Sequence, residues 1–162
     1  MKRRTLRRLT TSPRGTGQYA KKIARLLSGI KSGQAAVVGL SGELGAGKTV
    51  FARELLRALG VKEKIVSPTF VLLREYKTSS GVYPTAYHLD AYRLSGALDA
   101  KPLRLGELMK KKGNLLLIEW PERIKGAMPG RALTVRFRHG RKSNERVIEF
   151  LEPTPKRRRP TR

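Results

Sequence analysis

The sequence feature that most constrains the fold is an eight-residue glycine-rich segment, Gly-Glu-Leu-Gly-Ala-Gly-Lys-Thr, which starts at Gly42. Before it, residues 34–40 are apolar and rich in valine, as in a buried parallel strand. After it, residues 48–59 are typical of a helix that ends at Gly60. A strand, a glycine loop and a helix in this order form a phosphate-binding loop, so a P-loop α/β fold is predicted.

Each part of this loop suits a nucleoside triphosphate bound with Mg²⁺. Glycine permits backbone conformations closed to other residues, so the loop N–H groups can point at phosphate oxygens. Lys48 would reach the β- and γ-phosphates, and the Thr49 hydroxyl would ligate Mg²⁺. The helix N-terminus would add partial positive charge. The predicted nucleotide-binding residues of the loop are Gly42, Glu43, Leu44, Gly45, Ala46, Gly47, Lys48 and Thr49.

A magnesium-nucleotide site also needs a carboxylate, usually at the end of a neighbouring strand. Glu119 follows the apolar run 115–118, where a Walker B carboxylate is expected, and we favour a metal role over a simple strand end. Asp90 ends the strand-like run from Tyr83. Taken by itself, Asp90 fits a metal role and a simple strand end equally well. Which of the two acids contacts the metal directly is likewise open.

The rest of the pattern predicts a three-layer α/β domain with a mixed, mainly parallel sheet. Apolar residues over 19–30 have helical spacing, and 98–112 also suggests a helix. Five further strands are expected at 69–76, 83–90, 114–120, 133–137 and 146–151. A short turn joins the strands at 69–76 and 83–90, so these two should be antiparallel. The strands at 133–137 and 146–151 should form a closing hairpin. The ATPase-like domain is placed at 15–152, between a basic N-terminal extension (1–14) and a basic C-terminal tail (153–162).

The chain is strongly basic, with 36 Lys and Arg against 12 Asp and Glu, a net charge of +24. Such a field favours polyanions, RNA above all, although solvated tails or a basic proteome explain it equally well. The absence of cysteine excludes disulfides, cysteine-bound zinc and thiol catalysis. No apolar stretch approaches the ~20 residues of a membrane-spanning helix, and we expect a cytoplasmic protein.

Other motifs are missing or ordinary. No Asn-Lys-x-Asp segment is present to read guanine, which disfavours a GTPase. The two histidines have simple interpretations, His88 as a hydrogen-bonded strand residue and His139 as a turn residue.

With four segments taken together, the chain resembles the TsaE family, small P-loop ATPases of bacterial tRNA threonylcarbamoyladenosine synthesis. The loop alone is generic, but the other three segments are far more specific. The resemblance extends from about residue 9 to 151 and is carried by Gly-Glu-Leu-Gly-Ala-Gly-Lys-Thr at 42–49, Ser-Pro-Thr-Phe at 67–70, His-Leu-Asp-Ala-Tyr-Arg at 88–93 and Ile-Glu-Trp-Pro-Glu-Arg at 118–123.

The resemblance implies an ATP- and Mg²⁺-dependent ATPase that supports the TsaB–TsaD threonylcarbamoyl-transferase pair without performing the transfer, with tRNA reached through that complex or the basic tails. Lys48 and Thr49 would hold phosphate and metal, and Glu119 would belong to the magnesium shell. The same resemblance gives roles to six further residues. Thr69 would sense the γ-phosphate, Asp90 would position water or metal, Thr11 would lie near adenine, and Trp120 would contact either the nucleotide or the core. Arg93 and Arg123 could stabilise transition-state charge, although ordinary surface pairing is favoured for Arg123.

Some positions depart from the family pattern. Glu43 stands where aspartate is usual, and Val50 stands where a second hydroxyl residue is common. The segment 98–113 matches poorly, and 156–162 has no counterpart. Two other functions compete with the accessory ATPase: a P-loop small-molecule kinase, and an RNA-binding module regulated by nucleotide. Hydrolysis by the isolated chain is expected to be very slow.

Overall fold

The computed structural model describes residues 5–30, 33–68 and 72–152, which form one seven-stranded sheet with helices on both faces. The strands are β1 (Thr5–Thr10), β2 (Ala36–Gly42), β3 (Leu73–Lys77), β4 (Thr85–Asp90), β5 (Asn114–Glu119), β6 (Leu133–His139) and β7 (Arg146–Leu151). The helices are α1 (Pro13–Ser28), α2 (Lys48–Ala58) and α3 (Leu105–Lys110), with the 3₁₀ segments η2 (Lys101–Leu103) and η3 (Pro121–Ala127).

The sheet is parallel at its centre and antiparallel at both edges, in the order β1-β7-β6-β2-β5-β4-β3. β2 pairs in parallel with β5 and β6, and β4 pairs in parallel with β5. β3 is antiparallel to β4, and β7 is antiparallel to β6 and β1. The mixed sheet and both predicted antiparallel pairs are confirmed. The description "mainly parallel" holds only for the four central strands, since the described strands make three pairs of each kind.

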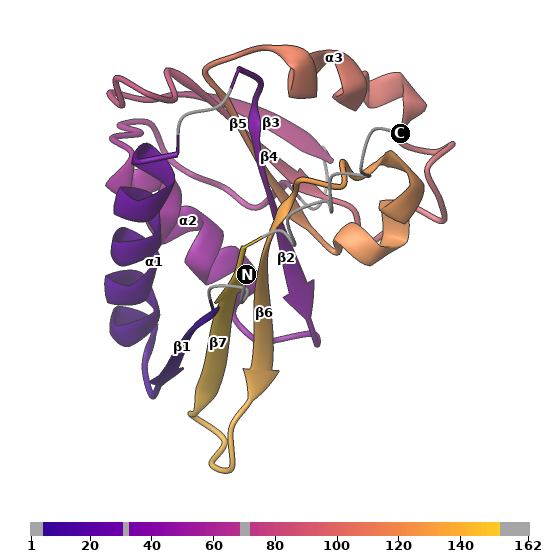
Figure 1. The fold of residues 1–162 in the computed structure, drawn as a ribbon. Coiled ribbons are helices and arrows are strands. Elements are labelled where there is room, and N and C mark those ends of the chain that lie inside the picture. The colour runs from indigo at the N-terminus through magenta and orange to yellow at the C-terminus, as the bar shows by residue number, and fades with distance from the viewer. Residues whose placement is uncertain (1–4, 31–32, 69–71, 153–162) are drawn as a thin grey trace, which may run out of the picture.

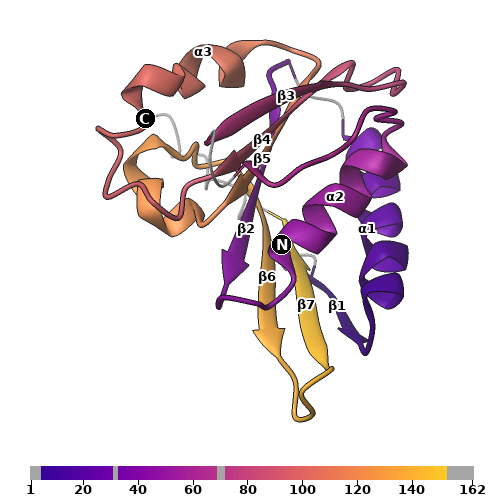
Figure 2. The same cartoon turned by 180° about the vertical axis from the view of Figure 1, so that it is seen from behind.

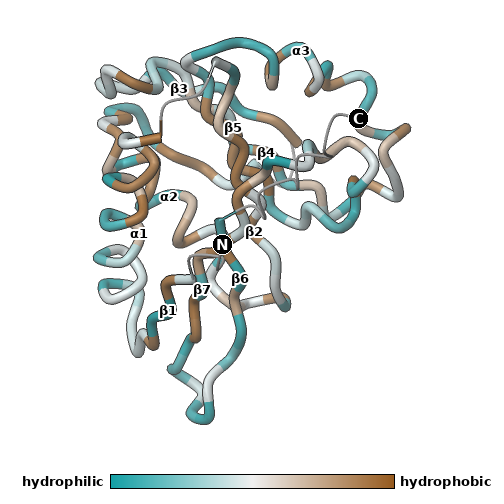
Figure 3. The backbone as a smooth tube through the Cα atoms, in the orientation of Figure 1, coloured by the Kyte–Doolittle hydropathy of each residue, from teal (hydrophilic) through white to brown (hydrophobic). Residues whose placement is uncertain are grey.

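The sheet lies between two helical layers, as predicted (Figures 1 and 2), and an apolar core fills the space on each face. α1 and α2 pack on one face of the sheet, where Phe51 and Phe137 are fully buried. α3 and η3 cover the other face, with Leu105 and Ile124 buried against β4 and β5. β5 is buried along its whole length, which explains its continuous apolar run, visible as the brown centre of the sheet in Figure 3.

The sheet includes part of the predicted basic extension, because residues 5–10 form the edge strand β1. This strand pairs with β7 from Thr5 opposite Leu151 to Thr10 opposite Arg146. The Tyr19 hydroxyl of α1 donates to the Leu6 carbonyl at 2.6 Å. The other side chains of β1 are mostly exposed, two of them arginines, so the strand resembles a charged tail in the sequence.

The longest described helix, α1, begins where the chain offers a cap. The Ser12 hydroxyl accepts a hydrogen bond from the Gly15 N–H, and Pro13 occupies the first turn, where its missing N–H costs nothing. Its inner stripe enters the core, while Lys21, Lys22 and Arg25 remain exposed. Neither α1 nor any other described helix combines the length and apolar character needed to cross a membrane.

The single helix predicted over 98–112 is wrong. The segment instead contains η2 and the six-residue α3, separated by Arg104, whose backbone is left-handed with φ 51°. Pro102 fits the first turn of η2 but would interrupt a longer helix. Only Leu105 and Met109 of α3, four residues apart, are buried in the second core.

Candidate functional site

The predicted phosphate-binding loop lies between β2 and α2, at the carboxyl ends of the parallel strands. Gly42, Gly45 and Gly47 all have positive φ, which permits the tight path of the loop. Gly47 is the N-cap of α2 and has no side chain to satisfy the first helical N–H groups. The N-terminus of this eleven-residue helix therefore offers backbone donors and a partial positive charge to an anion.

Lys48 is buried, with its ammonium turned into the loop. Its Nζ donates to the carbonyls of Gly42 and Glu43, both at 2.7 Å, and lies 3.9 Å from the centroid of the Trp120 ring. Burial lowers the pKa of Lys48, while the nearby carboxylates, Glu119 first among them, act in the opposite direction. The loop thus holds a cation where phosphate oxygens can compete with two carbonyls.

Thr49 and Glu119 are brought together across 70 residues of sequence. The parallel β2–β5 register places Glu119 opposite Leu40, near the end of β2, and the loop that follows β2 leads to Thr49. The Thr49 hydroxyl donates to Glu119 Oε2 at 2.9 Å, and the glutamate is only 2% exposed. A hydroxyl beside a carboxylate at the mouth of a phosphate loop is a donor set that Mg²⁺ accepts when nucleotide phosphates complete its shell.

Asp90 joins the same edge of the sheet, opposite Glu119 in the β4–β5 register. It is 8% exposed, and its Oδ1 accepts a hydrogen bond from the Tyr92 N–H at 3.0 Å. The described residues hold no cluster of three or more His, Cys, Asp or Glu side chains suited to a metal by themselves. Mg²⁺ in nucleotide sites usually takes one or two carboxylates and completes its shell with phosphates and water.

His88 is the main residue that the sequence interpretation undervalued. It is 1% exposed, and its Nε2 lies 2.7 Å from Glu119 Oε1. The prediction of a hydrogen-bonded strand residue is correct, and the partner is Glu119, the carboxylate predicted to hold the metal. The available signal was the spacing of His88 and Asp90, two residues apart on a strand that ends at the site and hence on one face.

Two aromatic side chains, Tyr92 and Trp120, lie beside the loop and line the same hollow. Trp120 has a left-handed backbone with φ 57°, and its ring centroid lies 5.0 Å from that of Tyr92. The Arg123 guanidinium lies over the Tyr92 ring at 5.6 Å, while the Arg93 side chain is exposed. Trp120 is thus both a neighbour of Lys48 and a partly buried residue packed against the second core, while its predicted contact with the nucleotide stays a prediction.

Two adjoining hollows open around the loop. One, of about 380 Å³, is lined by Lys48, Thr49, Asp90, Glu119 and Trp120 together with loop residues and Tyr92. The other, of about 230 Å³, is lined by residues 11–13, Thr16, Asn144 and Arg146, and it shares Gly45, Gly47 and Val50 with the first. The structure thus brings Thr11 to a hollow that the loop also lines, while its predicted place beside adenine stays a prediction. A third hollow, of about 540 Å³, lies at the amino ends of β2, β4 and β5 and contains none of the predicted site residues.

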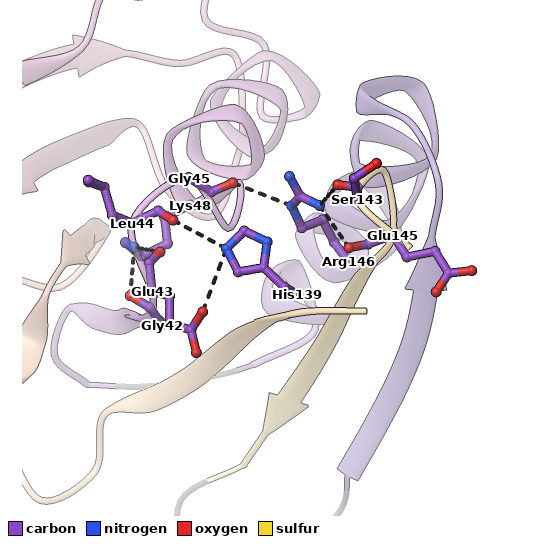
Figure 4. A network of polar contacts seen from close by, with 9 residues as sticks. All are labelled: Gly42, Glu43, Leu44, Gly45, Lys48, His139, Ser143, Glu145 and Arg146. Atoms are coloured by element: carbon purple, nitrogen blue, oxygen red, sulfur yellow. Dashed lines mark hydrogen bonds and ion pairs between the residues drawn. The ribbon is translucent and has the colours of Figure 1, made fainter. Parts of the chain in front are cut away.

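The β6–β7 hairpin also contacts the loop, through His139 and Arg146, and the sequence did not predict these contacts (Figure 4). His139 Nε2 lies 3.3 Å from the Leu44 carbonyl and 3.6 Å from Glu43 Oε2. Arg146 Nε donates to the Gly45 carbonyl at 3.3 Å, and its Nη1 donates to hairpin carbonyls. His139, interpreted as a turn residue, is therefore the last residue of β6 and a contact of the loop. Thr69, the predicted γ-phosphate sensor, lies outside the described residues.

Comparisons with known proteins agree with this geometry. The sequence profile of the family described as "Threonylcarbamoyl adenosine biosynthesis protein TsaE" matches residues 10–148. A TsaE protein of Rickettsia felis is 46% identical over 110 residues, which is 67% of this chain and 60% of that protein. One from Treponema pallidum is 35% identical over 82% of this chain and 91% of its own length. The crystal structure of Bacillus subtilus YdiB superposes with a TM-score of 0.74 at 28% identity, covering 95% of this chain and 89% of that one. The match thus spans less than two thirds of the Rickettsia protein but most of the other two.

Proposed function

Since the chain belongs to the TsaE family, we propose that it is the ATP-binding and ATP-hydrolysing accessory subunit of the tRNA threonylcarbamoyladenosine modification machinery. In this role it supports the cycle of the TsaB–TsaD transferase pair and does not itself transfer the threonylcarbamoyl group. The observation that carries the proposal is the Thr49–Glu119 hydrogen bond of 2.9 Å beside the buried ammonium of Lys48. This arrangement joins the three groups that a magnesium-nucleotide site needs.

The two adjoining hollows support this proposal, because we expect the nucleotide to occupy both of them. The triphosphate would lie over the loop, with Lys48 exchanging its two carbonyl partners for phosphate oxygens. The base and sugar would lie in the hollow that contains Thr11, reached across Gly45 and Gly47. Thr49 and Glu119 would hold Mg²⁺, which when bound neutralises the charge that develops on the phosphates.

Hydrolysis by the chain alone should be slow. The described residues that line the hollow over the loop include no arginine, and the Arg123 guanidinium lies against Tyr92. Asp90 would position water or metal, but its Oδ1 is already engaged by the Tyr92 N–H. A partner that contributes or orients a cation would accelerate such a site, as trans-acting arginines do by about 10³- to 10⁵-fold in other P-loop enzymes.

The direct test is phosphate release from Mg-ATP by the purified chain, measured alone and with the TsaB–TsaD pair. We expect slow turnover alone and acceleration by the pair. A rate that is indifferent to the pair would argue against the accessory-subunit role. Phosphate transferred to a small metabolite, with no release to water, would instead establish the kinase.

Contact with tRNA is the second part of the proposal, and it is supported by charge and by topology. β1 and β7 are adjacent, with Thr5 opposite Leu151, so the basic segments at the two ends of the chain are attached at the same end of the sheet. On the first face, α1 carries the exposed Arg14, Lys21, Lys22 and Arg25 and no acidic residue. Phosphate binding by such segments releases counterions and is therefore sensitive to salt.

Deletion of residues 153–162 should weaken tRNA binding and flatten its salt dependence. The segment holds five Lys and Arg residues, and each phosphate contact contributes about 0.9 to the slope of log K against log salt, so the magnitude of the slope should fall by up to ~4.5. Fluorescence anisotropy of labelled tRNA between low and physiological salt measures this. A slope identical to that of the full chain would remove the tail from the interface.

A further inference from the structure

We propose that His88 is a positioning residue that fixes the carboxylate of Glu119 for the metal-nucleotide complex, an inference that rests on the proposed function. His88 lies on β4 and Glu119 on the neighbouring β5, with their side chains on the same face of the sheet as α2. The ring Nε2 lies 2.7 Å from Glu119 Oε1, and the two side chains are 1% and 3% exposed. An ionised carboxylate only accepts hydrogen bonds, so Nε2 carries the hydrogen of this contact.

The two oxygens of Glu119 have different partners. Oε2 accepts from the Thr49 hydroxyl at the start of α2, whereas Oε1 accepts from His88 on the neighbouring strand β4. If the Thr49 oxygen were to hold Mg²⁺, Oε2 would lose this hydrogen bond and would be available to the metal or its water shell. Oε1 remains held by His88, so the carboxylate keeps its orientation at the moment when its other bond is lost. Partners of this kind orient ligands and are known to matter nearly as much as the ligands themselves.

His88 acts through Glu119 and not on the nucleotide. Both Thr49 and Glu119 line the hollow over the loop, but His88 does not. Its second nitrogen, Nδ1, is buried and has no hydrogen-bond partner among the described residues. A histidine retained only to stabilise the core would be expected to satisfy both nitrogens, because buried polar atoms rarely stay unpaired. Within the described ranges, the one hydrogen bond of the ring is the bond to Glu119.

The residue opposite His88 shows the same incomplete pairing. Arg74 of β3 faces His88 directly in the antiparallel β3–β4 register, and its buried Nε also lacks a partner within the described part of the chain. With the hydrogen on Nε2, Nδ1 is an acceptor, whereas Arg74 Nε is a donor. The bond between these two groups is not made in this structure, which leaves Glu119 as the group that orients the imidazole.

Two substitutions separate positioning from packing. Gln places its amide nitrogen near the position of Nε2 and can still donate to Glu119, whereas Asn places its amide near Nδ1 and falls short. His88→Asn should therefore raise the Mg²⁺ concentration needed for tight ATP binding, or lower kcat, by about 10- to 100-fold. His88→Gln should recover most of that loss. ATP binding in EDTA should be unchanged in both, because the Lys48 contacts do not involve His88.

The measurement is a Mg²⁺ titration of ATP binding followed by fluorescence. Trp120 is the one tryptophan of the chain and lies against Lys48, so its emission reports on the site. Thermal unfolding of each variant and steady-state phosphate release with the partner pair complete the set.

The possible results distinguish a failure of the role proposed for His88 from a failure of the proposed function. Wild-type Mg²⁺ dependence and kcat in His88→Asn would overturn the positioning role alone. Equal impairment of both variants, with a lower unfolding temperature and weakened ATP binding in EDTA, would assign His88 to the core and also overturn it. A wild-type chain whose ATP binding ignores Mg²⁺ would overturn both the inference and the proposed function.

Discussion

Replacement of Lys48 by alanine is expected to lower phosphate release from Mg-ATP by about 10²- to 10³-fold, the range seen when a donor that stabilises transition-state charge is removed. Nζ is held by the Gly42 and Glu43 carbonyls at 2.7 Å, so the ammonium is already in the loop before any phosphate arrives. The transferred phosphoryl group gains negative charge that this cation is placed to stabilise. Phosphate release at saturating Mg-ATP with the partner pair measures the effect.

The matched control is Lys62→Ala, because Lys62 is exposed and follows the C-terminal end of α2, whereas the loop precedes its N-terminal end. It removes the same charge from a strongly basic chain, so a general electrostatic effect on ATP would affect both variants. Lys48→Ala should also change the emission of Trp120 without nucleotide, since the ammonium lies 3.9 Å from its ring. Equal hydrolysis by the two variants, both folded by circular dichroism, would contradict the assignment of the loop.

The parts of the site that lie close together in sequence could be predicted from it. The loop and the start of α2 are contiguous, so the glycines, Lys48 and Thr49 follow from one local motif. Glu119 and Asp90 followed from a simple rule, that acids at the ends of apolar strands meet at one edge of a parallel sheet, and the β4–β5 register places them opposite each other. What each of these residues binds remains a prediction.

The supporting contacts could not be predicted, because they depend on register and on distant chain segments. His88 and Glu119 are 31 residues apart, while His139 and Leu44 are 95 apart and Arg146 and Gly45 are 101 apart. The spacing of His88 and Asp90 indicates a shared face, but no local pattern specifies the partner in any of these pairs, since a shift of one residue in a strand would turn each side chain to the other face. The same reason applies to β1, whose pairing with β7 is invisible in a segment that resembles a charged tail.

Replacement of Gly42 by alanine should lower the free energy of unfolding by about 3 kcal/mol or more, in the range of strained backbone and overpacking combined. Gly42 has φ 143°, and an added Cβ would lie 2.3 Å from the Phe137 carbonyl oxygen and 3.0 Å from its Cβ. The two residues are paired in the β2–β6 register, so relief would require the strands to separate. Phe137 resists such movement because its ring packs edge-on against Phe51 with centroids 5.3 Å apart.

Gly45→Ala separates this crowding from the general cost of a left-handed backbone. Gly45 has φ 71°, and a Cβ there would meet no atom within 4 Å, so only the conformational cost of ~1–2 kcal/mol applies. Urea unfolding followed by circular dichroism measures both variants, and equal losses would contradict the steric argument. Since β6 ends at His139, which contacts the loop through the Leu44 carbonyl, a displaced strand should also loosen the loop. Gly42→Ala should therefore weaken ATP binding under conditions in which the chain remains folded, and the crowding that destabilises the sheet would act on the site through the same strand.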